Sequence, residues 1–180
     1  MKNQIDPKIL IRDATEDDIV QQHLYLKNSS DEFLLSLGVD PNVIRNSPDQ
    51  SERIRKMLSI PVKSRPNHTF AGDIENKLVG MITLKNIIYG DSAEVHGHIL
   101  HIENRRQGLA SKHYVEFLKK AFATFELKIL ICEPSTTNVA INAFLQKIGL
   151  KLKATYKVPA SGILLPRTAN RYEIEPSFIQ

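Results

Sequence analysis

Apolar and polar positions alternate along this 180-residue chain with two different periods, and each period predicts a type of element. Between 108 and about 125, apolar residues recur at spacings of three and four, which predicts a long helix with one buried face. These apolar positions are Val115, Leu118, Phe122 and Phe125. The segment LKILICEP (127–134) is instead a continuous apolar run, which is typical of a strand buried on both faces.

The N-terminal half predicts a strand, a group of short helices and a hairpin. Residues 9–12 read as a strand, and the following ATEDD supplies a capping threonine and an acidic first turn for a helix. Glycine and proline interrupt the helical pattern of residues 31–60, so we expect two short helices there. Residues 69–90 read as two strands joined by a turn at Glu75 and Asn76, which predicts an antiparallel hairpin.

The C-terminal third predicts one more helix and two more strands. Residues 135–149 read as a capped helix that is closed by Gly149. Two strands are expected at 152–158 and 171–175, separated by a loop rich in proline and glycine. Because strands and helices alternate without an internal repeat or a linker, we expect an α/β fold with a single domain over residues 1–180.

Composition narrows the classes of function. No segment approaches the roughly 20 apolar residues of a membrane span, and acidic residues near the N-terminus argue against a signal peptide. Cys132 has no second cysteine to pair with, which suits the cytoplasm and a place in the core. The formal charge of +4 is scattered among twenty acidic residues and lacks interleaved aromatics, so we expect no nucleic-acid partner and no membrane partner.

The sequence RRQGLA lies between an extended segment and the long predicted helix. Gly108 at such a junction lets the backbone turn tightly, and the helix N-terminus offers free N–H groups that suit a pyrophosphate. Arg105 and Arg106 add positive charge, and Gln107 and Ser111 can donate hydrogen bonds. On these residues alone, an ordinary solvated helix start remains the alternative.

Two motifs in the right order resemble those of the GNAT superfamily of acyl-CoA N-acyltransferases. RRQGLA resembles the family's RxxGxA phosphate-binding motif, and NVAINAFLQKIGL resembles its second signature, with Asn138 and Gly149 matching and Leu150 in place of an aromatic residue. The order of strands and helices agrees along nearly the whole chain. The lack of a tyrosine in AFLQKIG is most similar to the branch that contains the ribosomal-protein N-terminal acetyltransferases.

The resemblance implies a mixed, mostly antiparallel sheet of six to seven strands, splayed between its fourth and fifth strands, with helices on both faces. The pantetheine arm of acetyl-CoA, the expected co-substrate, would lie in the gap. The implied cofactor-binding residues are Leu100, Ile102, Arg105, Arg106, Gln107, Gly108, Leu109, Ala110, Ser111 and Asn138. In this scheme the backbones of Leu100 and Ile102 bond the pantetheine amides, while Asn138 contacts the arm from the other side.

Glu94, His96 and His98 share one face of a predicted strand, because side chains alternate with period two. The opposite face, Val95, Gly97 and Ile99, is expected to be core. Acetylation of an amine needs a base poised near neutrality, which histidine provides with little tuning and glutamate provides if burial raises its pKa.

The three residues are therefore the expected catalytic residues, with Glu94 and His96 ranked first. Glu94 lies eleven residues before Arg105 (105 − 94), as does the glutamate base of histone-type family members, and His96 matches a strand histidine of arylalkylamine-type members. Both matches assume that no bulge shifts the register. A backbone N–H near His98 to Leu100 is expected to stabilise the oxyanion.

The sequence departs from the family at the group that protonates the leaving thiolate. Leu145 occupies the usual tyrosine position, so the thiolate leaves unassisted, or water or another residue such as Tyr156 serves. We expect an N-acetyltransferase that moves an acetyl group to a primary amine, of a small molecule or a peptide N-terminus, by direct attack in a ternary complex. The alternative is a non-catalytic acyl-CoA-binding or sensor module.

A metal site is not expected, although HGH (96–98) has a ligand-like spacing, because His101 points to the other face and no other ligand cluster exists. The acceptor has no readable code. Four acidic residues of the early helices would attract a cationic amine if they were not simply solvated: Asp31, Glu32, Asp40 and Asp49. The sequence leaves a homodimer open.

Overall fold

The structure is a computed structural model that describes residues 9–99 and 109–179. Within these ranges seven strands form one mixed sheet in the order β1-β2-β3-β4-β5-β7-β6, in which only the β4–β5 pair is parallel. The strands are β1 (Leu10–Asp13), β2 (His68–Ile74), β3 (Lys77–Ile88), β4 (Ser92–Ile99), β5 (Ile129–Cys132), β6 (Leu152–Val158) and β7 (Arg167–Ile174).

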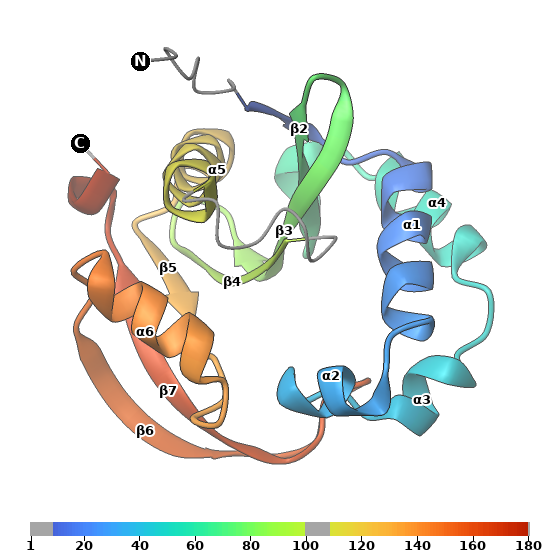
Figure 1. Cartoon of the computed structure of the whole chain (residues 1–180). Coiled ribbons are helices and arrows are strands. Elements are labelled where there is room, and N and C mark those ends of the chain that lie inside the picture. The colour runs from blue at the N-terminus through green and yellow to red at the C-terminus, as the bar shows by residue number, and fades with distance from the viewer. Residues whose placement is uncertain (1–8, 100–108, 180) are drawn as a thin grey trace, which may run out of the picture.

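Helices cover both faces of the sheet (Figure 1). Helices α5 and α6 share one face, and α1 and α4 lie across the sheet from α5. The helices are α1 (Glu16–Lys27), α2 (Asp31–Ser36), α3 (Pro41–Arg45), α4 (Ser51–Ser59), α5 (Leu109–Phe125) and α6 (Val139–Lys147), with short 3-10 helices η1 (Val62–Ser64) and η3 (Pro176–Ile179). Among the described helices none is long and apolar enough to cross a membrane. The architecture is the mixed, splayed sheet that the resemblance implies.

The main core lies between the sheet and the α5–α6 layer. Phe70 of β2 and Leu84 of β3 are fully buried against α5, and Phe125 of α5 packs edge-on to Phe70. Leu145 of α6 and Tyr172 of β7 extend the same core to the far side of the sheet. Leu118, Phe122 and Phe125 therefore lie on the buried face of the long helix as predicted, whereas Val115 is only half-buried and lies outside this core.

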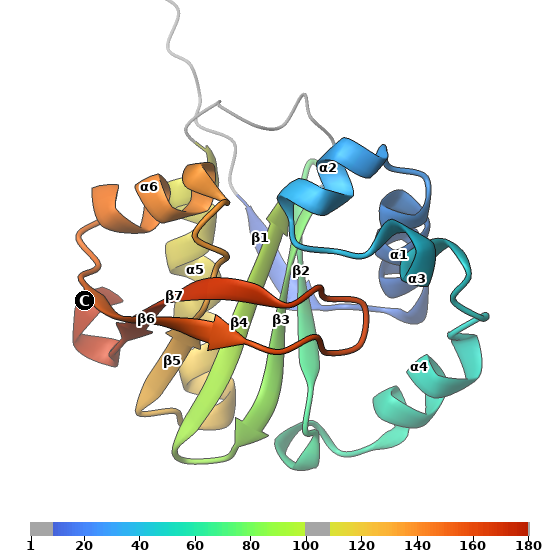
Figure 2. The same ribbon diagram turned by 90° about the horizontal axis from the view of Figure 1, so that it is seen from below.

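A smaller core joins the early helices to the connection between β6 and β7. Leu34, Val39 and Ile44 are buried together, and Ile163 and Leu164 pack against them. Val39 and Leu164 form a β-bridge, so the β6–β7 hairpin is fastened to the segment between α2 and α3 (Figure 2). Segments that lie more than 100 residues apart thus form one wall beside β3 and β4.

Strands β4 and β5 are paired over a short distance only. Their register joins Ser92 to Ile129, Ala93 to Leu130 and Glu94 to Ile131, after which β5 ends at Cys132 while β4 continues to Ile99. The edge of β4 beyond Glu94 therefore faces a widening separation from β5. This is the predicted position of the splay.

A helix cap and the ion pairs of one arginine fix the N-terminal strand and helix. Thr15 and Asp18 form a reciprocal capping box at the start of α1. Arg12 of β1 donates to Asp18 at 2.5 Å and to Asp73 of β2 at 2.7 Å, and these hydrogen bonds raise the pKa of its guanidinium above its ordinary value. One arginine thereby ties β1, β2 and α1 together.

Three boundaries differ from the prediction. Residues 31–60 contain three helices and not two, because Asp40 caps a separate short helix that starts at Pro41. Helix α6 starts at Val139, since Ser135 forms a β-bridge with β7 and cannot be helical. The last strand begins at Arg167, so the loop before it is shorter than expected. Each difference comes from a contact that is distant in sequence or from a local cap.

A glycine at the β2–α5 contact gives a test of the main core. A Cβ on Gly72 would lie 2.7 Å from Ile9 Cδ1 and 2.9 Å from Phe117 Cζ, so Gly72→Ala is expected to lower the free energy of unfolding by about 1–3 kcal/mol through overpacking. Gly97→Ala is the matched control, because its Cβ would meet Ile82 at an ordinary 3.6 Å. Equal denaturation midpoints for the two variants would contradict this account of the core.

Candidate active site

The predicted catalytic strand is β4, and it runs without a bulge through all three candidate residues. Its pairing with β3 is continuous from Lys85 opposite Glu94 to Gly80 opposite Ile99, and the register shift lies before this stretch, between Lys85 and Ile88. Glu94 and His96 therefore lie on one face of the strand, as the sequence predicted. The backbone of His98 continues the same alternation.

The opposite face of β4 is part of the core. Val95 is 2% exposed, and a Cβ on Gly97 would point at Ile82 and Tyr114. This confirms the prediction that Val95 and Gly97 are turned away from the candidate catalytic face. Burial of one face of β4 thus keeps the polar side chains of the strand on its opposite face.

Glu94 is ionised and held in place. Asn86 Nδ2 donates a hydrogen bond of 2.8 Å to Glu94 Oε1, and His96 Nε2 lies 3.6 Å from Glu94 Oε2. The interaction with His96, followed by the hydrogen bond from Asn86, outweighs partial burial and lowers the pKa of Glu94 to about 2. Burial by itself would raise this pKa, but His96 and Asn86 outweigh it, so the structure does not meet the condition under which Glu94 would be a base near neutrality.

His96 has a ring nitrogen without a hydrogen-bond partner. Its Nε2 atom is buried and makes no hydrogen bond within the described ranges, since 3.6 Å to Glu94 is beyond hydrogen-bonding distance but within reach of an ion pair. A neutral imidazole in this position can accept a proton, and the neighbouring carboxylate stabilises the resulting positive charge. The unpartnered ring nitrogen of His96 and the ionised carboxylate of Glu94 therefore lie side by side on one face of β4.

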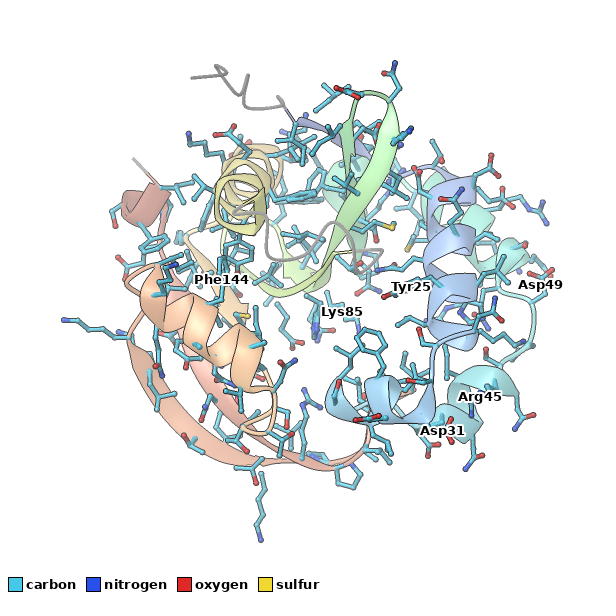
Figure 3. All side chains as sticks on the ribbon, viewed as in Figure 1. Tyr25, Asp31, Arg45, Asp49, Lys85 and Phe144 are labelled. Carbon is cyan, nitrogen blue, oxygen red and sulfur yellow. The ribbon has the colours of Figure 1, made fainter. Side chains whose placement is uncertain are left out.

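Lys85 lies directly across from Glu94, and the motif analysis did not select it. Burial lowers the pKa of Lys85, the positive charges of Arg167 and Arg53 lower it further, and Glu94 opposes them. Figure 3 shows Lys85 projecting from β3 into the region flanked by α1 and α2 on one side and α6 on the other. The sequence does contain a signal for Lys85. The second strand of the predicted hairpin (69–90) pairs with the strand that carries Glu94, and this pairing places Lys85 opposite Glu94.

The predicted phosphate-binding turn lies mostly outside the described residues. Leu100, Ile102, Arg105, Arg106, Gln107 and Gly108 belong to the part of the chain that is not described, and His101 does as well. Leu109, Ala110 and Ser111 form the first turn of α5. The described part of the long helix thus begins at Leu109.

Asn138 is the N-cap of α6. Its side chain accepts from the N–H of Ile141 at 3.4 Å. The buried Asn142 holds this helix end, because its amide donates to the carbonyls of Ser135 and Asn138, both at 2.8 Å. Sequence reasoning missed Asn142, whose position in a helix of mainly apolar residues was the available signal. Asn142 thus sets the position of the predicted cofactor residue Asn138.

The candidates for thiolate protonation differ in their surroundings. Leu145 is fully buried in the core, so the usual tyrosine position offers no acid. Tyr156 donates its hydroxyl proton to Glu133, which also pairs with Arg171 at 3.0 Å. The Cys132 thiol is buried, and burial raises its pKa to about 12, which confirms the prediction of a core residue. Within the described ranges no group of three or more His, Cys, Asp or Glu residues is arranged to hold a metal ion.

Fold and site together define an acyltransferase of the GNAT class: a sheet that splays beside a polar strand face, with a long helix that follows the sequence RRQG. Residues 8–151 match the family model described as the acetyltransferase (GNAT) domain. The chain belongs to this family, which confirms the resemblance seen in its two motifs. It is an acetyltransferase, and GNAT enzymes use acetyl-CoA. No curated protein matches the sequence.

Solved structures with the same fold have distant sequences. Spermidine N-acetyltransferase from Vibrio cholerae, in complex with CoA and spermine, has a TM-score of 0.72 at 16% identity over 95% of this chain and 97% of that one. RimL, a ribosomal L7/L12 α-N-protein acetyltransferase in complex with coenzyme A, has a TM-score of 0.71 at 15% identity over 93% of each chain. At these identities the likeness establishes the fold and leaves the acceptor open.

The low pKa of Glu94 has a measurable origin. His96→Ala is expected to raise this pKa the most and Asn86→Ala to raise it less, because His96 is the larger contributor. Carboxyl-resolved NMR titration measures both. The pKa of Glu126, lowered by Tyr89 and Lys63, serves as the internal control and stays unchanged.

The same shift has a consequence for stability. A carboxyl whose folded pKa is depressed stabilises the fold above its ordinary pKa of 4.5, and this contribution is lost as pH falls toward about 2. Glu94→Gln is therefore expected to cost more stability at pH 7 than at pH 3. A cost that is equal at the two pH values in denaturant titrations would refute the assignment.

Proposed function

We propose that this acetyltransferase moves an acetyl group from acetyl-CoA to a primary amine, of a small molecule or a peptide N-terminus, by direct attack in a ternary complex. The observation that carries the proposal is the buried, unpartnered Nε2 of His96 beside the ionised Glu94, next to the point where β4 separates from β5. A base of this kind is what an ammonium substrate requires before it can attack a thioester.

In the proposed reaction His96 Nε2 takes a proton from the ammonium group of the acceptor. The free amine then attacks the thioester carbonyl carbon, and the tetrahedral intermediate loses a second proton from its nitrogen to water as it collapses to the amide with departure of the CoA thiolate. Glu94 stays ionised throughout and stabilises the imidazolium at 3.6 Å. Backbone N–H groups near His98 to Leu100 are proposed to stabilise the oxyanion.

The free edge of β4 supports binding of acetyl-CoA. After Glu94 the strand has β3 as a partner on one side, and the described residues provide no strand on the other. An extended ligand with amide groups can use such an edge as an additional strand would. We assign this role to the β4 edge and its continuation through Leu100 and Ile102, with the 105–111 turn for the pyrophosphate and Asn138 for the pantetheine arm.

Protonation of the thiolate is assigned to water. Leu145 has no acidic proton, and the Tyr156 hydroxyl is engaged with Glu133. A thiol is acidic enough to leave as its thiolate near neutral pH with little assistance, so no dedicated residue is required. The absence of a tyrosine at Leu145 is also what favours the second candidate, a module that binds acyl-CoA without turnover.

Substitution of the base tests the proposal. His96→Ala is expected to lower kcat by about 100- to 10,000-fold with little change in acetyl-CoA affinity, and Glu94→Gln to lower it less. Because Glu94 is ionised well below neutrality, it cannot account for a change in rate between about pH 5 and 8, where an imidazole titrates. Thiol release with a panel of amines, followed across this pH range, provides the measurement.

His23→Ala is the control, since His23 lies on α1 and bonds Ser47 away from β4. It is expected to keep full activity. Tight CoA binding without transfer to any amine would favour the non-catalytic module, and full activity of His96→Ala would remove His96 from the mechanism.

Changes in the basic turn test cofactor binding separately. Gly108→Glu, or Arg105 and Arg106 both changed to Glu, is expected to abolish CoA binding by placing negative charge at the pyrophosphate while leaving the fold intact. Calorimetry with CoA measures the affinity, and circular dichroism checks the fold. Unchanged affinity would return RRQGLA to an ordinary helix start.

A further inference from the structure

Two cationic side chains from distant segments approach the face of the sheet that carries Glu94 and His96. Lys85 comes from β3 and Arg167 from the start of β7, and their charges are close enough for Arg167 to lower the pKa of Lys85. Within the described residues the ammonium of Lys85 has no hydrogen bond or salt bridge, although Glu94 lies across from it. Arg53 of α4 adds a third positive charge from a third element.

Arg167 carries an orphaned donor. Its Nη1 atom is buried, yet it has no hydrogen-bond partner among the described residues. The side chain is held by the hairpin wall, since its Cδ lies 3.7 Å from the position that a Cβ on Gly38 would take. A buried guanidinium donor is costly to leave unpaired, and its preferred partner is a planar oxyanion. This donor is therefore placed for a ligand.

Three of the four acidic residues of the early helices that would favour a polycationic acceptor are engaged elsewhere, and the fourth, Glu32, is exposed. Asp31 pairs with Arg45, Asp40 caps α3 through the N–H groups of Asn42 and Val43, and Asp49 accepts from Ser51. Among the described residues whose charges act on Lys85, Glu94 is negative and Arg167 and Arg53 are positive. A second ammonium on the acceptor would be repelled, whereas an anionic group would be attracted.

We propose that the acceptor is an amine that also carries an oxyanion, either a carboxylate or a phosphate. Arg167 and Lys85 bind the oxyanion and so direct the amine toward His96. This selectivity rests on the proposed function, and it separates the chain from a spermidine-type acceptor. Arg167 and Lys85 act here as specificity-determining residues and take no part in proton transfer.

Matched acceptors test the selectivity. β-Alanine and O-phosphoethanolamine carry an oxyanion, β-alaninamide lacks it, and spermidine replaces it with further ammonium groups. The KM of at least one oxyanion-bearing amine is expected to be roughly 10- to 100-fold lower than that of β-alaninamide, with spermidine the poorest acceptor. The preferred member of the first pair distinguishes a carboxylate from a phosphate. Equal KM values for β-alaninamide and both oxyanion-bearing amines, or a preference for spermidine, would overturn the proposal.

Substitutions locate the effect. Arg167→Gln is expected to raise the KM for the preferred acceptor by roughly 10- to 100-fold and to leave that for β-alaninamide nearly unchanged, with Lys85→Gln giving a smaller shift of the same kind. Arg55→Gln is the control, because it removes the same guanidinium charge from an arginine of α4 that pairs with Glu16 on the surface. Equal effects of Arg167→Gln and Arg55→Gln would refute the assignment.

Product binding separates this proposal from the proposed function. Calorimetry with N-acetyl-β-alanine and N-acetyl-β-alaninamide on CoA-loaded protein measures oxyanion recognition without turnover. Tighter binding of N-acetyl-β-alanine that is lost in Arg167→Gln, with no transfer to any amine, would support the oxyanion site and refute the transferase mechanism. Transfer to amines without any preference for an oxyanion would support the transferase mechanism and refute the oxyanion site.

Discussion

The short pairing between β4 and β5 is the constraint on which the rest of this structure depends. Three residue pairs hold the strands together, and the pairing stops where β5 ends at Cys132. Beyond Glu94 one edge of β4 is therefore released from the sheet while β3 still fixes its register. Pairing with β3 keeps this part of β4 rigid. Its other edge can bond a ligand, because the described residues provide no strand partner there.

The rigidity of β4 fixes the distance between the charged groups on its polar face. Because Val95 is buried on the core side of β4, Glu94 and His96 are held together on the other face, and Asn86 from the preceding strand bonds the carboxylate. The low pKa of Glu94 that results makes it a permanent negative charge. The proposed mechanism therefore assigns proton uptake to the imidazole of His96 and not to this carboxylate.

Packing far from β4 completes the surroundings of this face. The bridge between Val39 and Leu164 and the core beneath it hold the β6–β7 hairpin against the early helices. This contact brings Arg167 to the neighbourhood of Lys85, although the two residues are more than 80 positions apart. The surroundings of Lys85 and Arg167 are consequently set by hydrophobic contacts between segments whose polar residues alone suggest no common site.

The sequence by itself determined the order of most elements, the family motifs and the shared face of Glu94 and His96, because periodicity and strand alternation are local properties. It did not predict α3 as a separate helix between α2 and α4. It also did not place Lys85, Asn86 or Arg167 beside Glu94. Those features depend on strand register, on caps and on contacts across the chain. The tertiary structure alone decided the pKa of Glu94 and the positive charge around it, since both are sums over neighbours that only folding brings together.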